Sequence, residues 1–266
     1  MDRVGIILAG GYGTRLRPVT NSISKHIIPI HDKPMIFYPL SILMLMKIKK
    51  IFIVVTEKDF NQYEKLLGDG SNYGVKINYI FQNEPLGIAD GLLKCEKYVK
   101  KQRVCLILGD NIFYGSDLKL NFTKISNTKK NTIIGYRVSK PENYGVINFD
   151  KKNKITLIEE KPKKPKSNYV VTGIYFYEKY IFEYLKKLKP SKRNELEITD
   201  LNNLLIKKNK LNCKIFGRGY AWLDAGTFDD LIETSRMIAT LEARQNLKVA
   251  CLGEIAFNNK WINKEK

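Results

Sequence analysis

The sequence of 266 residues has few cysteines and histidines and lacks a long apolar run. Its four cysteines, Cys95, Cys105, Cys213 and Cys251, include no CxxC pair, and with two histidines in the chain they make a poor zinc site or disulfide framework. Isolated cysteines are typical of a reducing compartment. No segment offers about 18 consecutive apolar residues, and the apolar run at 4–9 is too short for a signal peptide. We therefore expect a cytoplasmic protein without a membrane partner.

Acidic residues are also scarce, since 46 lysines and arginines face 27 aspartates and glutamates, for a formal net charge of +19. Such a charge is compatible with a nucleic-acid partner. Only nine of the basic residues are arginines and 37 are lysines, whereas base edges are read chiefly by the planar fork of arginine. No nucleic-acid-binding motif is present. We therefore predict a solvated lysine-rich surface and no nucleic-acid partner, and we keep a basic nucleic-acid-binding protein as an alternative.

Hydrophobic residues make up 44% of the sequence. In its first half, short apolar runs alternate with longer segments of helical character. Short apolar runs that suit strands buried on both faces lie at 4–8, 51–55, 77–81 and 104–108. Segments of helical length or periodicity separate them, at 34–47, 61–67 and 87–100. Because parallel strands need crossover connections, this alternation predicts a parallel α/β sheet.

The pattern becomes richer in β-structure after about residue 130. Strands are expected at 132–138, 146–149, 155–159 and 170–177, and helices at 181–188, 198–207 and 228–242. No repeat or low-complexity linker divides the chain. We predict one α/β domain over residues 1–266, with a Rossmann-like, mixed and mainly parallel sheet flanked by helices.

A glycine-rich segment with the sequence LAGGYGTRL follows the first strand, at residues 8–16. Glycines there allow positive φ and close approach, so that backbone N–H groups can face a phosphate chain. The segment is not a Walker A loop, and it lacks the third glycine of a dinucleotide fingerprint. Arg15 and Lys25 add cationic charge that suits a transferring phosphoryl group. The segment predicts a phosphate-binding loop, with an ordinary glycine turn as the alternative.

Two aspartates, Asp110 and Asp224, each end an apolar run. Ligands of open parallel sheets bind at the carboxyl ends of the strands. Two carboxylates that meet a triphosphate suggest Mg²⁺. The two residues are 114 positions apart, so their proximity is an inference, and each alone is also compatible with a turn or helix-cap aspartate.

With Arg15 included, the glycine-rich segment resembles the signature of the nucleotidyltransferases that make nucleoside-diphosphate sugars. The resemblance extends along nearly the whole chain through the blocks DKPMI (32–36), LGDGSN (67–72), LGDN (108–111), EEKP (159–162), VTGIY (171–175), ELEITD (195–200) and GYAWLD (219–224). Single blocks are shared with other sugar-nucleotide pyrophosphorylases. The ordered set resembles the glucose-1-phosphate thymidylyltransferases, the first enzymes of the dTDP-sugar branch that leads to dTDP-rhamnose and cell-surface polysaccharides.

The resemblance implies transfer of a thymidylyl group from dTTP to α-D-glucose 1-phosphate, giving dTDP-glucose and pyrophosphate. A UTP-dependent enzyme, or one for another sugar 1-phosphate, is the alternative within the class. Both reactants are anionic, so in-line positioning and charge neutralisation are most of the catalytic task. The resemblance also implies a homotetramer, Mg²⁺ on Asp110 and Asp224, and catalytic roles for Arg15, Lys25, Asp110, Lys161 and Asp224.

The resemblance divides the binding residues between a nucleotide-binding half (1–130) and a sugar-phosphate-binding half (131–240), followed by a helical, regulatory segment (241–266). The nucleotide residues are Leu8, Gly10, Gly11, Gly13, Thr14, Arg15, Gln82, Gly87 and Asp110. The sugar-phosphate residues are Asn111, Tyr144, Gly145, Glu160, Lys161, Val171 and Arg193. An amide such as that of Gln82 can pair with a pyrimidine edge, although Gln82 also fits an ordinary strand-end residue. By composition alone Lys161 belongs to a solvated lysine run at 161–166.

Three positions depart from the family pattern. His26 and Asp90 stand where glutamine is common, near the triphosphate and the nucleobase respectively, and a carboxylate at position 90 cannot donate as an amide can. Ser116 stands where histidine is common, in a second, regulatory nucleotide site to which the resemblance also assigns Gly115, Arg218 and Lys248. The family usually continues beyond Lys266 into a further short helical segment. These departures leave a sugar-nucleotide-binding pseudoenzyme as a further alternative.

Overall fold

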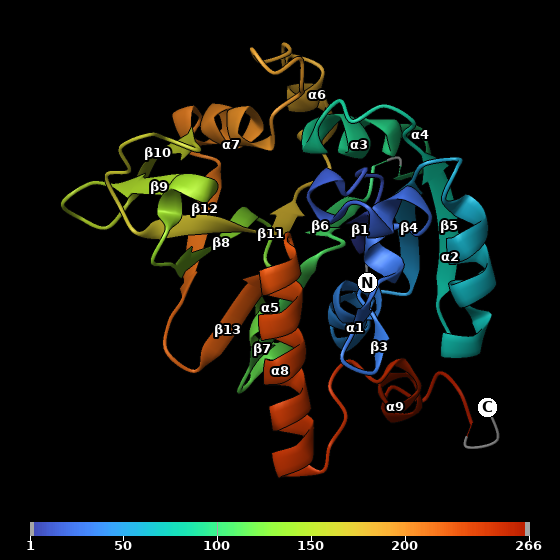
Figure 1. The fold of residues 1–266 in the computed structure, drawn as a ribbon. Coiled ribbons are helices and arrows are strands. Elements are labelled where there is room, and N and C mark those ends of the chain that lie inside the picture. The colour runs from blue at the N-terminus through green and yellow to red at the C-terminus, as the bar shows by residue number, and fades with distance from the viewer. Residues whose placement is uncertain (1–2, 100, 264–266) are drawn as a thin grey trace.

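The computed structural model describes residues 3–99 and 101–263. Residue 100 of the helical segment expected at 87–100 and residues 264–266 of the predicted segment 241–266 lie outside that range, as do residues 1 and 2. Within it, the protein is built on a nine-stranded sheet whose main path runs β10-β9-β11-β6-β1-β4-β5 (Figure 1). Four of its strands come from the first half of the chain and pair in parallel: β1 (Arg3–Leu8), β4 (Lys50–Val55), β5 (Lys76–Phe81) and β6 (Arg103–Leu108).

The second half of the chain extends the sheet with mixed pairing. Its strands are β8 (Asn131–Arg137), β9 (Gly145–Phe149), β10 (Ile155–Glu160), β11 (Tyr169–Tyr177) and β12 (Leu211–Phe216). Strand β11 runs antiparallel to β6 and joins the two halves, and β12 runs parallel to β8 at the edge. Two further ladders are antiparallel: β7 (Asn111–Gly115) with β13 (Tyr220–Asp224), and β2 (Pro29–Ile30) with β3 (Lys33–Pro34).

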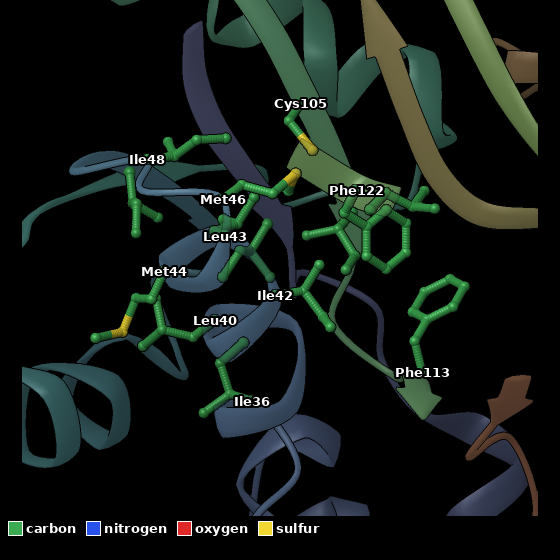
Figure 2. Close-up of a cluster of buried hydrophobic side chains, with 14 of the residues drawn as sticks. Ile36, Leu40, Ile42, Leu43, Met44, Met46, Ile48, Cys105, Phe113 and Phe122 are labelled. Carbon is green, nitrogen blue, oxygen red and sulfur yellow. The ribbon is translucent and has the colours of Figure 1, made fainter. Parts of the chain in front are cut away.

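Helices cover both faces of the sheet, because its strands alternate buried residues to both sides. The helices are α1 (Phe37–Leu45), α2 (Phe60–Leu67), α3 (Ile88–Lys94), α4 (Glu96–Val99), α5 (Leu118–Asn127), α6 (Ile181–Leu185), α7 (Ile198–Lys207), α8 (Phe228–Gln245) and α9 (Leu252–Asn258). On one face, Ile7 and Ile107 pack with side chains of α1, α2, α5 and α9; on the other, Ile6 and Leu106 pack with α3, α4, α6 and α7. Figure 2 shows the first cluster, where α1 meets Cys105, Phe113 and Phe122.

The predicted fold class is confirmed, and the apolar runs of the first half all form parallel strands. The segment expected to be helical at 87–100 is interrupted at Cys95 between α3 and α4. The sequence did not indicate α5, β7 or β12. In β12 buried Leu211 and Phe216 lie at the two ends, with exposed Asn212 and Lys214 between them, so no apolar run marks this strand. Among the described residues, no helix is long and apolar enough to cross a membrane.

Candidate active site

A cavity of about 320 Å³ lies where β1 and β6 end. All nine residues predicted to bind the nucleotide line it, and they lie with other lining residues, Lys25, His26, Pro85, Ile88, Leu108, Glu195 and Gly226. The parallel pairing of β1 with β6 places Leu8 directly beside Leu108, so that the glycine-rich segment and the segment before Asp110 leave the sheet together. The cavity therefore occupies the carboxyl edge of the parallel strands, where the fold class places ligands.

The glycines of the loop differ in what they leave room for. Gly13 has φ +59°, and a Cβ added there would lie 2.9 Å from Thr20 Cγ2. The Thr20 hydroxyl donates to the Gly13 carbonyl over 2.8 Å and holds this turn. At Gly11 a Cβ would meet no heavy atom within 4 Å. Gly13 is thus required by the fold of the loop, whereas Gly11 leaves its backbone open to a ligand.

Lys25 and Asp110 form an ion pair at the base of the cavity, with Lys25 Nζ 2.5 Å from Asp110 Oδ2. The Asn111 side chain donates to the other oxygen, Oδ1, over 2.9 Å. Burial opposes the charge of Asp110, but the positive charge of Lys25 outweighs burial and lowers the pKa of the carboxyl to about 2. Asp110 is therefore ionised at neutral pH.

Asp224 is brought beside Asp110 by the ladder between β7 and β13. In that ladder Asp224 lies opposite Asn111, and the next residue, Ala225, donates its N–H to the Asp110 carbonyl over 3.0 Å. Burial, with the charges of Asp110 and Asp230, raises the pKa of the Asp224 carboxyl to about 6, although the Tyr144 hydroxyl donates to Asp224 Oδ1 over 2.7 Å. The carboxylates are therefore close enough to interact, although 114 positions separate them in the sequence.

His26, one of the departures from the family pattern, packs against Gly109, the residue before Asp110. It is 5% exposed, and a hydrogen bond of 3.2 Å joins His26 Nδ1 to the Tyr63 hydroxyl. Burial lowers the pKa of His26 to about 4. His26 is therefore a neutral wall of the cavity at pH 7, so Lys25 and Arg15 are the cations that line it.

A second, wider cavity of about 1230 Å³ continues from the first. The two share Arg15, Ile88, Leu108, Asp110 and Glu195, so together they form one cleft with Asp110 at the junction. All seven residues predicted to bind the sugar phosphate line the wide cavity, as does Asp224. The structure thus brings all the predicted catalytic and substrate-binding residues to one cleft.

Charged side chains of the wide cavity hold one another in place. Glu160, at the end of β10, accepts a hydrogen bond of 2.6 Å from the Thr199 hydroxyl, and its other oxygen lies 3.5 Å from the Arg193 guanidinium. Arg193 also pairs with Glu197 over 2.9 Å. Lys161 follows directly, with φ +44°, and its N–H donates to the Tyr144 carbonyl over 3.0 Å. This hydrogen bond ties the Lys161 backbone to Tyr144, and Lys161 is the lysine of the run at 161–166 that lines the cavity.

At the other end of the cleft, Gln82 and Gly87 lie together near α3. The Gln82 side-chain nitrogen donates to the Gly87 carbonyl over 3.2 Å and to Asp90 Oδ2 over 2.7 Å. Asp90, another departure, thus acts here as an acceptor.

The residues predicted for a regulatory site lie outside both cavities, and the structure groups three of the four. Gly115 pairs with Tyr220 at the end of the β7–β13 ladder, and Ser116 is beside Gly219, which follows Arg218. Lys248 instead contacts Asp32 over 2.7 Å and Glu242 over 2.6 Å. Asp32 and Glu242 form, with His31, a group whose ligand atoms lie within 4.8 Å of one another. Lys33 also pairs with both carboxylates, so two lysines already neutralise them.

Sequence reasoning missed residues that hold the site together. Asn111 Oδ1 accepts hydrogen bonds from the Trp222 indole (2.6 Å) and the Gly173 N–H (2.9 Å). A Cβ at Gly173 would lie 2.5 Å from Asn111, so only glycine allows this approach. Gly226 likewise packs against the Arg15 guanidinium. Trp222 and Gly173 belong to the sequence blocks GYAWLD and VTGIY, so the resemblance already marked these segments. Their contact with Asn111 could not be predicted, because Asn111 is distant from both in the sequence.

Comparisons with known proteins agree with this geometry. A family model for nucleotidyl transferases matches residues 4–240. The glucose-1-phosphate thymidylyltransferase of Xanthomonas campestris is 48% identical over 266 residues, which cover 100% of this chain and 90% of that protein. The corresponding protein of Neisseria meningitidis is 46% identical over 263 residues, covering 98% and 91%.

Solved structures give the same result. A Bacillus anthracis protein assigned as a glucose-1-phosphate thymidylyltransferase, crystallised with sucrose, superposes with a TM-score of 0.81 at 39% identity, covering 88% of this chain and 94% of that one. A UDP-glucose pyrophosphorylase in complex with UDP-glucose superposes with a TM-score of 0.78 at 25% identity, covering 91% and 100%. The predicted family is confirmed: the chain belongs to the nucleotidyl transferases and, within them, to the glucose-1-phosphate thymidylyltransferases.

Proposed function

We propose that this enzyme transfers a thymidylyl group from dTTP to α-D-glucose 1-phosphate, releasing pyrophosphate and dTDP-glucose. The observation that carries the proposal is the single cleft in which a glycine-rich cavity and a wide polar cavity meet at Asp110, with Asp224 on the side of the wide cavity. Family membership supports the identity of the substrates, because the relatives are named glucose-1-phosphate thymidylyltransferases.

The chain's own residues act by charge and position. An oxygen of the sugar phosphate attacks the α-phosphorus of the nucleotide, and the two anions repel each other. Arg15 lines both cavities and reduces this repulsion, and Lys25, which is fixed by Asp110, adds a second cation. Lys161 binds the sugar phosphate, Glu160 orients the sugar, and Arg193 reaches the phosphates of the sugar nucleotide. The attacking phosphate is already ionised at pH 7, so no side chain has to remove a proton.

Magnesium fits the acidic pair. Asp110 and Asp224 offer only oxygen ligands, which Mg²⁺ prefers, and the pKa of Asp224 is raised by burial and by the negative charges of Asp110 and Asp230, which a bound cation would offset. We therefore propose that these two residues hold Mg²⁺, which when bound would draw charge from the phosphate oxygens and assist departure of pyrophosphate.

The remaining family properties are proposals on resemblance. We propose a nucleotide-binding half over 1–130 and a sugar-phosphate-binding half over 131–240; the lining of the narrow cavity supports this division, since all of it except Glu195 and Gly226 lies in the first half. We also propose a homotetramer in the cytoplasm that supplies dTDP-rhamnose synthesis. A regulatory dTDP-sugar site at Gly115, Ser116 and Arg218 is proposed with the segment 241–266. Light scattering of the purified protein tests the assembly, and a monomer at micromolar concentration would contradict it.

A pyrophosphate-release assay tests the activity. Purified protein with Mg²⁺, dTTP and glucose 1-phosphate is expected to release pyrophosphate, and omission of either substrate is expected to abolish release. A series with dTTP, UTP, dCTP and dATP, and with several sugar 1-phosphates, separates the thymidylyltransferase from a UTP-dependent or other-sugar enzyme. No release by folded protein with any pair would refute the proposal and favour a pseudoenzyme.

A further inference from the structure

The side chain of Asp90 is tied to the nucleobase end of the cleft through Gln82. Asp90 is 9% exposed, in the first turn of α3, and Gln82 is 7% exposed at the end of β5. Asp90 Oδ2 accepts the Gln82 amide N–H over 2.7 Å, and Lys94 Nζ lies 3.7 Å from the same oxygen. The carboxylate therefore has a buried donor on the cavity side and a partly exposed cation on the solvent side.

These contacts leave one orientation for the Gln82 amide. Its nitrogen faces two groups that can only accept, the Asp90 carboxylate and the Gly87 carbonyl. Rotation of the amide by 180° would place its oxygen against both acceptors and leave a buried carboxylate oxygen without its donor. Such an arrangement is disfavoured because it leaves buried polar groups without hydrogen-bond partners.

The orientation decides which polar groups remain for a ligand. Within residues 3–99 and 101–263, Gln82 Oε1 accepts no hydrogen bond and the Gly87 N–H donates none. Gln82 and Gly87 both line the narrow cavity, and Oε1 lies between the glycine-rich loop and α3, 3.6 Å from where a Cβ of Gly10 would be. Two neighbouring residues of the cavity lining thus leave one acceptor and one donor without a protein partner in the described part of the chain.

We infer that Asp90 is a positioning residue for nucleobase selection: it holds the Gln82 amide so that the oxygen faces the cavity and favours a base that presents a ring N–H next to a carbonyl. Thymine and uracil have that edge, with N3–H flanked by carbonyl oxygens. Cytosine has an unprotonated N3, which is an acceptor. The inference rests on the proposed function for the identity of the ligand and extends it to a residue that does not contact the base itself.

Titration calorimetry of the intact protein with dTTP, dUTP and dCTP tests the inference without any need for turnover. Wild type is expected to bind dTTP and dUTP more tightly than dCTP. Asp90→Ala removes the acceptor and frees the amide, so we expect about five- to tenfold weaker dTTP binding and a loss of about tenfold in preference over dCTP. The KM for glucose 1-phosphate should be unchanged.

Two variants separate positioning from charge. Asp90→Asn keeps an oxygen that can accept from Gln82, so it should retain most of the preference for dTTP over dCTP. Lys94→Ala removes the cation and leaves the bond between Asp90 and Gln82, so it should behave as wild type. If Asp90→Asn lost as much preference as Asp90→Ala, the effect would be one of charge and the inference would be wrong.

The outcomes distinguish this inference from the proposed function. Equal binding of dTTP and dCTP by wild type, or an unchanged preference in Asp90→Ala, overturns the role of Asp90 even if pyrophosphate is released. Selective binding that depends on Asp90, with no pyrophosphate release, supports the role and refutes the reaction. If Asp90→Ala does not fold, Asp90→Leu, which also lacks an acceptor but retains the volume, replaces it.

Discussion

The two cavities of the cleft are lined by different kinds of residue. The narrow one, about 320 Å³, is lined by five glycines from two loops and the segment after β13: Gly10, Gly11, Gly13, Gly87 and Gly226. The wide one, about 1230 Å³, is lined mostly by side chains and includes nine carboxylate residues and five cationic ones. Phosphates and a flat base suit backbone N–H groups in a narrow space, whereas a sugar with many hydroxyls needs side-chain acceptors.

The positive net charge is not concentrated in the cleft. The protein carries +19 overall, yet its wide cavity has more acidic than basic residues. Cations in the cleft, such as Lys25 and Arg193, are paired with carboxylates. Among the described lysines, only Lys25, Lys140 and Lys161 line either cavity, so most lysines lie away from the cleft.

The largest expected effect is at the junction of the two cavities. Asp110→Asn removes the carboxylate that fixes Lys25 and that we propose holds Mg²⁺, so kcat should fall by about 10³-fold, since metal charge stabilisation is worth several kcal/mol. Pyrophosphate release measures it, with circular dichroism to confirm folding. Asp150→Asn, in an exposed turn outside both cavities, is the matched control. If the activity of Asp110→Asn stayed within a few-fold of wild type, Asp110 would not be a ligand of the metal.

The second largest effect is expected in the wide cavity, where a substitution should affect binding of the sugar phosphate but not of the nucleotide. Lys161→Ala removes the proposed partner of the sugar phosphate, and a charge-assisted hydrogen bond of about 1.5–3 kcal/mol predicts a KM for glucose 1-phosphate raised by about 10- to 100-fold. The KM for dTTP should stay within about twofold. Lys164→Ala, in the same lysine run but outside the cavity, should resemble wild type. Equal behaviour of the two variants would mean that Lys161 is an ordinary surface lysine.

A pair of glycine variants tests the narrow cavity. Gly13→Ala forces alanine into φ +59° against Thr20, so the free energy of unfolding should fall by about 1–2 kcal/mol, measured by urea denaturation. Gly11→Ala meets no protein atom and should change stability by less than about 0.5 kcal/mol. If the triphosphate contacts the Gly11 backbone, the new methyl should still raise the KM for dTTP several-fold. An unchanged KM in a fully stable Gly11→Ala protein would place the phosphates elsewhere.

The smallest expected effect concerns the hydrogen bond between Tyr144 and Asp224. Tyr144→Phe removes a donor 2.7 Å from Asp224 Oδ1 and leaves the ring that packs against Trp222. A hydrogen bond worth about 1 kcal/mol predicts kcat about fivefold lower, with little change in the KM for dTTP. Tyr98→Phe, outside the cleft, serves as the control. A larger change in the dTTP KM than in kcat would couple Tyr144 to the narrow cavity and weaken the division between the two.

The sequence predicted much of this architecture for identifiable reasons. Apolar runs mark parallel strands because both faces of such strands are buried, which is why 4–8 and 104–108 were found and the edge strand β12 was not. Asn111 illustrates the limit at the site. It was predicted to contact substrate, yet its amide is held by Asp110, Trp222 and Gly173, residues that no local pattern connects.

What the sequence alone determined is the set of chemical groups and their order: a glycine-rich loop after the first strand, cations at 15, 25 and 161, and two strand-end aspartates. Those features are local, because backbone freedom, side-chain charge and the length of an apolar run depend only on residues that are neighbours in the sequence. Only the tertiary structure decided that Asp224 lies beside Asp110, that Lys25 is fixed by a carboxylate, and that Asp90 orients Gln82. These depend on strand pairing and on helix packing over the sheet, which bring distant residues within hydrogen-bonding distance.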